Sequence, residues 1–374
     1  MKEITTVGIV GFGVMGAAIG LNAASSGYRV VYKEVNDELV KAMYDKWVVK
    51  SLSKRVAAGK MTQDAMDAVT SKITGTSSYE GLAGCDLVIE AAVEAMDLKK
   101  TIFKDLAAAC PSDTIIVSNT STFLIETLME GIPNPGRTAG LHYFFPANIN
   151  KLVEVIRQKN TSDETYKALM GFAEKNRKIP ITVRDFPGFA INPVFISSYM
   201  ILDSFYGDTY SVATLEDISQ KALNIKFGIM WVQNGSGLGT CYHAAVSMNE
   251  YLGSTDVGYP ALPKCLETQF KSGKPWTLDD GAVLADESSR QVVAQRLLGG
   301  IFAISTHLIE KKVVSVKDLE LGIRTALAWP KGPFALMNDM GMAEARRLVL
   351  LSAKAGDFKV PATFASGTPS TWEV

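Results

Sequence analysis

The chain has 374 residues, more than one hydrophobic core usually organises, so we expect two domains. Hydrophobic residues make up 47% of the sequence and charged residues 21%, and the formal net charge is -1. This balance is typical of a compact globular protein. It gives no electrostatic reason to expect a nucleic acid or an anionic membrane surface as a partner, so any basic patch must be local.

The cysteines and the N-terminal residues favour an intracellular protein. Cys85, Cys110, Cys241 and Cys265 are scattered without a CxxC spacing, which favours reduced, buried thiols, and we predict no metal site. The N-terminus leads directly into an apolar strand, and no stretch of about 18 uncharged apolar residues follows. We therefore expect neither a signal peptide nor a membrane span, and we predict a cytoplasmic location.

The first half of the chain alternates short β-rich runs with helical stretches. The predicted strands cover residues 7–10, 29–32, 86–91, 114–117, 138–141, 151–156 and 179–183. Strands separated by helices of this length pair in parallel through right-handed crossovers. We therefore predict an α/β domain with a Rossmann-type parallel sheet over residues 1–186.

The second half shows helix-period apolar residues and few strand signals, so we predict an all-α C-terminal domain over residues 187–374. A faint self-similarity between the segments beginning at Leu215 and Val316 indicates two repeat-like units, at about 187–253 and 287–355. A polar linker, 253–286, would join them. The last stretch, 361–374, is rich in Ser, Thr, Pro and Gly and is expected to be a loosely held tail.

The most informative local pattern is the glycine-rich segment that directly follows the first predicted strand. Gly11 would permit a tight turn, Gly13 would let the backbone approach a pyrophosphate, and Gly16 would let helix and strand pack closely. Val14 and Met15, inside the same turn, would then supply N–H donors of the helix N-terminus to the phosphates. The pattern predicts a dinucleotide site; its alternative is a phosphate-free glycine turn.

An acidic residue ends the second predicted strand. Glu34 stands where a carboxylate would accept hydrogen bonds from the hydroxyls of the adenosine ribose. Because that carboxylate would repel a 2′-phosphate, the sequence favours NAD over NADP. The neighbouring Lys33 makes this preference less clear-cut.

Among the three histidines, one lies where an α/β sheet binds ligands. His142 directly follows the predicted strand 138–141, at the carboxyl end, whereas His243 and His307 lie in helical stretches. Glu154 interrupts an apolar strand, and a buried carboxylate there needs a partner. Pairing with His142 would satisfy Glu154 and would stabilise a protonated imidazole. The alternatives are a structural core histidine and a surface-facing glutamate.

Two further polar elements could complete a site. Ser121 ends the run Ser118-Asn119-Thr120-Ser121, which follows the strand 114–117 at its carboxyl end, and Asn192 precedes Pro193 where the helical domain begins. The run could equally be an ordinary turn, and Asn-Pro is a common start of a helix.

Taken together, these segments resemble the L-3-hydroxyacyl-CoA dehydrogenase family of fatty-acid β-oxidation, in a form similar to the 3-hydroxybutyryl-CoA dehydrogenases with a duplicated C-terminal helical domain. The resemblance covers nearly the whole chain. The matching blocks are GFGVMG at 11–16, Glu34, VIEAAVE at 88–94, SNTS at 118–121, GLHYFFP at 140–146, KLVEVI at 151–156 and PGFAIN at 187–192.

The resemblance implies roles for particular residues. His142 would be the general base, Glu154 would hold and polarise it, and Ser121 and Asn192 would hydrogen-bond the oxygens of the substrate. Four further residues would contact the cofactor: Glu94, Lys99, Ser118 and Asn119. The coenzyme A would be contacted by Ser51, together with Lys54 or Lys60. The lysines could equally be solvated helix residues.

Two positions depart from the family pattern. Phe145 stands where the family usually has a polar residue, often Asn, and Pro193 stands where an Arg usually follows the Asn. The first departure puts a hydrogen bond beside His142 in doubt and hints at an unusual acyl group. The second could alter the hinge between the domains.

The sequence thus predicts an oxidoreductase that uses NAD to oxidise an (S)-3-hydroxyacyl-CoA to a 3-oxoacyl-CoA, reversibly, in fatty-acid metabolism. One alternative is a dehydrogenase of the same fold that acts on a free hydroxy or sugar acid. Another is a non-catalytic protein that binds NAD or acyl-CoA. A homodimer through the helical domain is expected from the family, although duplication within one chain could replace that contact.

Overall fold

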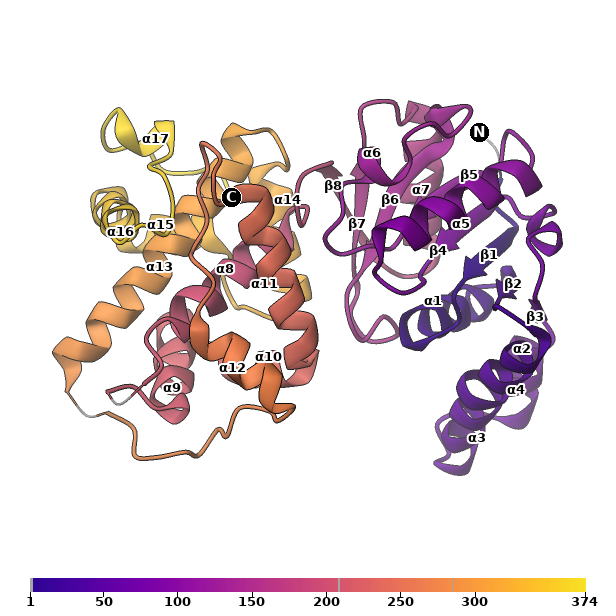
Figure 1. Cartoon of the computed structure of the whole chain (residues 1–374), viewed down its shortest axis with the longest axis horizontal. Coiled ribbons are helices and arrows are strands. Elements are labelled where there is room, and N and C mark those ends of the chain that lie inside the picture. The colour runs from indigo at the N-terminus through magenta and orange to yellow at the C-terminus, as the bar shows by residue number, and fades with distance from the viewer. Residues whose placement is uncertain (1–2, 208, 285) are drawn as a thin grey trace. The chain divides into compact units, whose positions relative to one another are not determined.

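The computed structural model describes residues 3–207, 209–284 and 286–374. The chain forms two compact units, with the boundary between Asp185 and Phe186 (Figure 1). The first unit is an α/β domain and the second is helical.

The first unit is built on one eight-stranded sheet with the order β3-β2-β1-β4-β5-β6-β7-β8. Its strands are β1 (Thr6–Val10), β2 (Arg29–Lys33), β3 (Ile73–Thr76), β4 (Leu87–Glu90), β5 (Ile115–Ser118), β6 (Thr138–Tyr143), β7 (Leu152–Arg157) and β8 (Ile179–Arg184). Strands β1, β4 and β5 are buried at every residue, as expected for central strands covered on both faces. The prediction of a Rossmann-type sheet is confirmed.

The sheet differs from the sequence prediction in two ways. Strand β3 was not predicted, because only one of its four residues is buried and one of them is a glycine. In addition, β6 and β7 pair antiparallel, whereas all other neighbouring strands pair in parallel. The prediction of an all-parallel sheet is therefore wrong at this pair. No helix separates the two strands, and a short connection allows the chain to turn back on itself.

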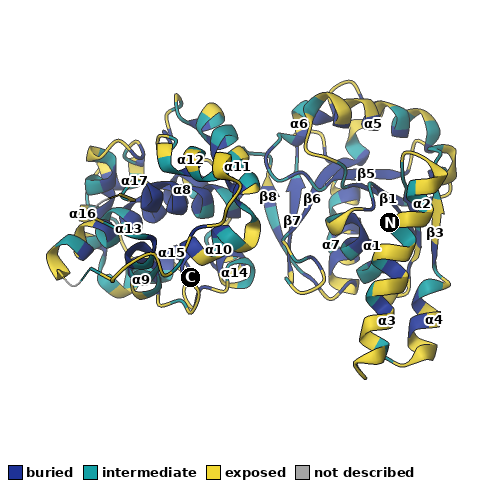
Figure 2. Ribbon diagram, turned by 60° about the horizontal axis from the view of Figure 1, so that its bottom comes forward, coloured by how far each residue is buried: buried dark blue, intermediate teal, exposed yellow. Residues whose placement is uncertain are grey.

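Helices surround this sheet, and one pair of helices projects from it. The helices are α1 (Val14–Ser25), α2 (Asp37–Met43), α3 (Lys50–Ala57), α4 (Gln63–Thr70), α5 (Met96–Ala109), α6 (Ile125–Leu128) and α7 (Asp163–Lys175), with the π-helix η1 (Tyr44–Val49) and the 3₁₀ helices η2 (Glu80–Leu82) and η3 (Pro135–Arg137). Figure 2 shows the strands largely buried, whereas α3 and α4 present mostly exposed residues.

The second unit consists of helices, of which two, α8 and α13, are largely buried. Its helices are α8 (Ile191–Asp203), α9 (Val212–Leu223), α10 (Ile229–Ser236), α11 (Leu238–Leu252), α12 (Lys264–Ser272), α13 (Glu287–Glu310), α14 (Val316–Ala326), α15 (Pro333–Met340), α16 (Met342–Lys354) and α17 (Ala362–Ala365). Helix α13 packs on α8 and α16. A Cβ atom on Gly299 would lie 2.2 Å from the Leu348 carbonyl oxygen of α16, so this close packing requires a glycine.

Helix α13 is also the one helix of the described chain that is long and apolar enough to cross a membrane. The mean hydropathy of its most apolar window is 1.5, and 67% of that window is buried inside the second unit. Such burial is typical of a core helix.

The two halves of the helical unit share a distinctive contact. Glu216 of α9 accepts hydrogen bonds from backbone N–H groups at the start of α10, from Gly228 at 2.7 Å and Trp231 at 3.1 Å. Glu320 of α14 does the same for three N–H groups at the start of α15. A carboxylate at this place satisfies otherwise unpaired donors and complements the positive end of the helix.

A second contact occurs once in each half. The Asn234 side chain exchanges two hydrogen bonds with the backbone of Trp276, and the Asn338 side chain exchanges two with the backbone of Trp372. Two contacts that recur in the same helical context support an internal duplication.

Two segments are more ordered than the sequence indicates. The linker 253–286 contains the helix α12. The expectation of a loosely held tail over 361–374 is wrong, because Phe364 is fully buried and Trp372 is bonded to Asn338. Burial of the Phe364 side chain and the backbone hydrogen bonds of Trp372 anchor a segment whose composition otherwise resembles a loop.

Candidate functional site

The glycine turn joins β1 to α1 in the arrangement that dinucleotides require. Gly11 has a φ of +83°, and a Cβ atom on Gly16 would lie only 1.9 Å from the Gly11 carbonyl oxygen. Both positions therefore need glycine. Gly13 has nothing within 4 Å of where its Cβ would be, so the backbone there is open to a phosphate. The N-terminus of α1 begins at Val14, which is half exposed, and Met15 packs partly against the core.

Glu34 lies beside this turn. Its Oε1 accepts a hydrogen bond of 2.6 Å from the Phe12 backbone N–H, while the Phe12 ring stacks on Tyr32 at 4.0 Å. The carboxylate is therefore fixed next to the glycine turn. The Lys33 ammonium lies 4.2 Å from the centre of the Tyr79 ring, where it makes a cation–π contact. These residues fit an adenosine ribose at Glu34 and a pyrophosphate at Gly13.

The antiparallel pair of strands brings His142 and Glu154 together. The two residues are direct partners in the β6–β7 register, and both side chains are buried. His142 Nδ1 lies 2.6 Å from Glu154 Oε2, and His142 Nε2 lies 3.2 Å from the Ser121 hydroxyl. The imidazole ring also lies against Phe144, with 4.5 Å between the ring centres. The carboxylate thus faces one ring nitrogen and the hydroxyl faces the other.

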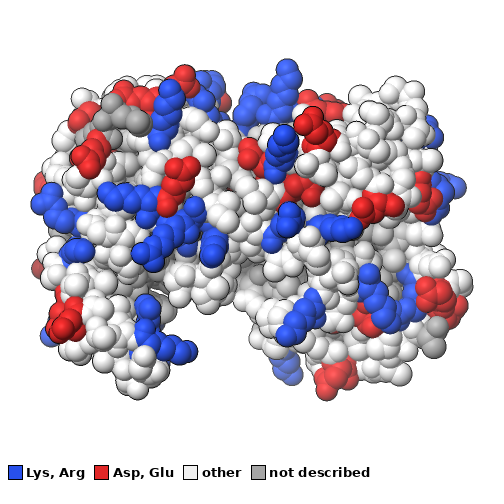
Figure 3. All heavy atoms as spheres, turned by 180° about the vertical axis from the view of Figure 1, so that it is seen from behind, with Lys and Arg blue, Asp and Glu red and all other residues white. Residues whose placement is uncertain are grey.

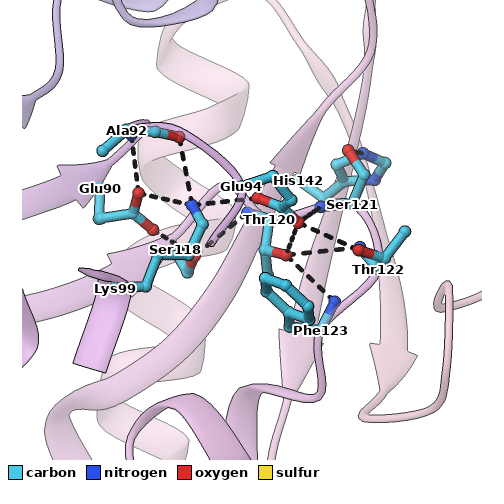
Figure 4. A network of polar contacts seen from close by, with 10 residues as sticks. All are labelled: Glu90, Ala92, Glu94, Lys99, Ser118, Thr120, Ser121, Thr122, Phe123 and His142. Atoms are coloured by element: carbon cyan, nitrogen blue, oxygen red, sulfur yellow. Dashed lines mark hydrogen bonds and ion pairs between the residues drawn. The ribbon is translucent and has the colours of Figure 1, made fainter. Parts of the chain in front are cut away.

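The loops after β4 and β5 are tied together by buried polar groups (Figure 4). Lys99 Nζ lies 2.6 Å from Glu90 Oε1 and 3.1 Å from Glu94 Oε2, and the Lys99 side chain is only 1% exposed. The Ser118 hydroxyl donates to Glu90 at 2.6 Å. Lys99 and Ser118 are therefore enclosed within this network.

Glu94 and Asn119 occupy the outer part of the same region. Burial alone would raise the pKa of Glu94, but Lys99 and the hydroxyls of Thr120 and Thr122 hold that pKa below its ordinary value. The Glu94 side chain is 40% exposed. Asn119 Oδ1 accepts a hydrogen bond of 2.8 Å from the Tyr143 backbone N–H and so holds the end of β6.

A cavity of about 150 Å³ lies along α1 in the first unit. Ser51 and Trp47 line it from the segment η1–α3, and the loop 145–148 closes the opposite side. Trp47 Nε1 is buried there without a hydrogen-bond partner. The other candidates for contact with coenzyme A are both exposed, Lys54 on α3 and Lys60 in the turn between α3 and α4.

The two positions that depart from the family pattern fall in different units. Phe145 is 57% exposed at the mouth of the cavity in the first unit. Asn192 and Pro193 belong to the first turn of α8 in the second unit.

The sequence interpretation missed several residues of this region. Glu90 was not singled out, although a charged residue that ends an apolar strand is a usable signal. Lys178 was also missed: its buried ammonium donates to the carbonyl oxygens of Ala147 and Asn150, and burial lowers its pKa to about 8. No sequence pattern marked Trp47 as a residue of this region.

The charged groups of the surface are mixed in sign. On the face drawn in Figure 3, Lys and Arg side chains are interspersed with Asp and Glu side chains. Among the described residues, no group of three or more His, Cys, Asp or Glu side chains is placed to hold a metal ion.

A mostly parallel sheet with a glycine turn after its first strand and an acid beside that turn is typical of dinucleotide-binding domains. Residues 6–186 match the family described as "3-hydroxyacyl-CoA dehydrogenase, NAD binding domain". The first unit is therefore an NAD-binding domain of the 3-hydroxyacyl-CoA dehydrogenase type.

Individual relatives agree with this assignment. The chain is 27% identical, over 376 residues, to the fatty acid oxidation complex subunit alpha of Idiomarina loihiensis. That match covers 91% of this chain and 51% of the relative, so the chain spans about half the length of that protein.

Solved structures share the fold. The 3-hydroxybutyryl-CoA dehydrogenase of Escherichia coli K12 superimposes with a TM-score of 0.83 at 20% identity, over 95% of both chains. The (S)-3-hydroxybutyryl-CoA dehydrogenase PaaH1 of Ralstonia eutropha gives a TM-score of 0.65 at 29% identity, over 72% of this chain and 95% of that chain.

Proposed function

We propose that this protein interconverts an (S)-3-hydroxyacyl-CoA and the corresponding 3-oxoacyl-CoA with NAD. The observation that carries the proposal is the line of contacts that joins the buried Glu154 and His142 to Ser121, in an NAD-binding domain of this family. Pure binding of a dinucleotide would not require a carboxylate and a hydroxyl on the two nitrogens of one imidazole.

In the oxidation, the imidazole of His142 acts as the general base. The hydroxyl proton of the substrate passes to His142 Nε2, while Glu154 at Nδ1 fixes the tautomer and stabilises the imidazolium that forms. Bound NAD supplies the acceptor of the hydride that leaves C3 of the substrate. The substrate thereby loses one proton and one hydride and gains a carbonyl group.

Two side chains would orient the substrate. Ser121, which contacts His142 Nε2, would hydrogen-bond the reacting oxygen, and Asn192 would hydrogen-bond an oxygen of the substrate. Coenzyme A would bind along the projecting helices, with Ser51 in the cavity and the ammonium groups of Lys54 or Lys60 facing its phosphates. We further propose a cytoplasmic enzyme of β-oxidation, which could function as a homodimer through its helical unit.

The experiment that tests this function compares a thioester with the free acid. NADH oxidation is followed by absorbance with acetoacetyl-CoA and, separately, with acetoacetate. We expect turnover with the thioester, a kcat/KM at least about 100-fold lower with the free acid because the coenzyme A contacts are missing, and an (S)-configured product. Preference for the free acid would support the alternative dehydrogenase. NADH binding without turnover of either substrate would support a binding protein.

A further inference from the structure

A buried ion pair lies beneath the loops that carry Ser121 and Glu94. Glu90, at the end of β4, is 0% exposed, and its partner Lys99 on α5 is 1% exposed. Removing two charges from water costs more than packing apolar side chains of the same volume, so stability alone does not explain such a pair. Its place at the carboxyl end of a central strand, where this fold binds ligands, points to a role in the site.

Glu90 uses both carboxylate oxygens to fix two loops. Its Oε1 accepts from Lys99 Nζ at 2.6 Å and from the Ala92 backbone N–H at 2.7 Å, which holds the loop after β4. Its Oε2 accepts from the Ser118 hydroxyl at 2.6 Å, and Ser118 in turn accepts from the Thr120 N–H at 3.1 Å. The second of these loops leads directly to Ser121.

The other side of Lys99 faces Glu94. Glu94 Oε2 lies 3.1 Å from Lys99 Nζ, and Glu94 Oε1 accepts hydrogen bonds from the Thr120 hydroxyl and from the Ser121 backbone N–H, the latter at 3.3 Å. In Figure 4 the Lys99 nitrogen lies between the two glutamates. The backbone of Ser121 is therefore held from two directions, through Ser118 and through Glu94, and both routes start at Glu90.

We infer that Glu90 is a positioning residue for the reaction: through Lys99 and Ser118 it sets the 3.2 Å contact between Ser121 and His142. The inference rests on the proposed roles of His142 and Ser121. Because Glu90 is 0% exposed, it would act through these neighbours rather than on the substrate directly. Because a small misplacement of reacting groups lowers the rate of the chemical step, loss of this carboxylate should affect kcat more than binding.

The test is Glu90→Gln in the full chain, which keeps the size of the side chain and removes its charge. With acetoacetyl-CoA and NADH we expect kcat to fall by about 10- to 100-fold, with both KM values changed less than about threefold. The primary isotope effect with 4-deuterated NADH should be larger than that of the wild type, because the hydride transfer itself is slowed. A loss of folded protein alone would lower the apparent kcat and leave the isotope effect and the KM values unchanged.

The second unit offers a matched control. The Asp357 carboxylate is 2% exposed and accepts from Arg296 at 2.7 and 2.9 Å and from the Ser352 hydroxyl at 3.0 Å, so, like Glu90, it is a buried acid held by one cation and one serine. Asp357→Asn should lower thermal stability to a similar degree while kcat per folded molecule stays within about twofold of the wild type. A loss of kcat per folded molecule in Asp357→Asn as large as in Glu90→Gln would overturn the inference.

A readout without turnover separates this inference from the proposed function. The chain has three histidines, so the imidazole NMR signals of His142 can be assigned with a His142→Gln variant. We expect Glu90→Gln, but not Asp357→Asn, to shift the His142 signals. Unshifted His142 signals, or an unchanged kcat, would overturn the inference. If the wild type shows no turnover, the proposed function fails. The NMR comparison still decides whether Glu90 positions the groups around His142. Should Glu90→Gln not fold, Ser118→Ala removes one of the two routes and must shift the same signals.

Discussion

Glu34 illustrates how a single side chain can set the choice of cofactor. Its carboxylate is fixed by the Phe12 N–H at 2.6 Å, beside the glycine turn, and would face the ribose of the adenosine. A 2′-phosphate at that position would meet a negative charge. The Lys33 ammonium, which could have attracted the phosphate, lies over the Tyr79 ring instead.

Replacing Glu34 by Gln should relax this discrimination. The amide oxygen can still accept from Phe12, but the charge that repels a 2′-phosphate is gone. We expect the ratio of kcat/KM for NADPH to that for NADH to rise by about tenfold, measured with one thioester at fixed concentration. Lys33→Gln serves as the control and should leave the ratio within about twofold. An unchanged ratio in Glu34→Gln would place the ribose elsewhere.

The sequence could predict some of the site residues and not others. His142 and Glu154 stand out because each is a polar residue in or beside an apolar strand, and the structure pairs them across the β6–β7 register. Glu90 and Glu94 stand in one short stretch, and periodicity does not tell which of them is buried. Burial of Glu90 depends on its contacts with Lys99 of α5 and Ser118 of β5, which are a tertiary property.

At the scale of elements, the end of α8 contains a carboxyl group in an unusual setting. Asp203 is fully buried; Oδ1 accepts from Gln233 at 2.9 Å, and Oδ2 is one of the buried atoms without a hydrogen-bond partner. Burial raises the pKa of Asp203 to about 8. The folded state therefore retains a proton that the unfolded chain releases near its ordinary value of 3.8.

This difference makes stability depend on pH. Between about pH 4 and pH 8 the folded protein binds more protons than the unfolded chain, so this group lowers stability progressively as pH rises through that window. Asp203→Asn removes the titration. We expect its Tm to exceed that of the wild type by at least about 3 °C at pH 8.5 and to be equal or lower at pH 4.5, by differential scanning calorimetry. A Tm difference that is the same at both pH values would contradict this account.

The elements themselves were predictable where their pattern is strong. Buried central strands such as β1 and β5 are continuous apolar runs, and the glycine turn marks the start of α1. Strand β3 was not predictable because only Ile73 of its four residues is buried. Its extended conformation is stabilised by pairing with β2 rather than by the strand propensity of its own residues. The direction of β7 was missed because strand direction follows from the connection rather than from the strand.

At the scale of the whole molecule, the first unit contains a complete core. Its hydrophobic cluster runs from Ile4 to Ala173 and includes residues of the sheet and of the helices around it. The glycine turn, Glu34 and the pair of His142 and Glu154 all belong to this unit. Asn192 belongs to the other.

We therefore expect residues 1–185 to fold alone and to bind NADH without turning over a thioester. Far-UV circular dichroism checks the fold, and quenching or enhancement of NADH fluorescence gives the Kd, which should lie within about tenfold of that of the full chain. Folded protein that does not bind NADH would show that the second unit contributes to the cofactor site. Turnover by this fragment would remove Asn192 from the proposed set.

The most direct test of the central claim is the kcat of His142→Gln with acetoacetyl-CoA and NADH, compared with the wild type and with His243→Gln, a histidine exposed in the helical unit. The account predicts a loss of about 1,000-fold for His142→Gln, with the Kd for NADH changed less than about threefold, and no loss for His243→Gln. A His142→Gln enzyme that keeps more than about a tenth of the wild-type kcat would contradict the assignment of His142 as the general base.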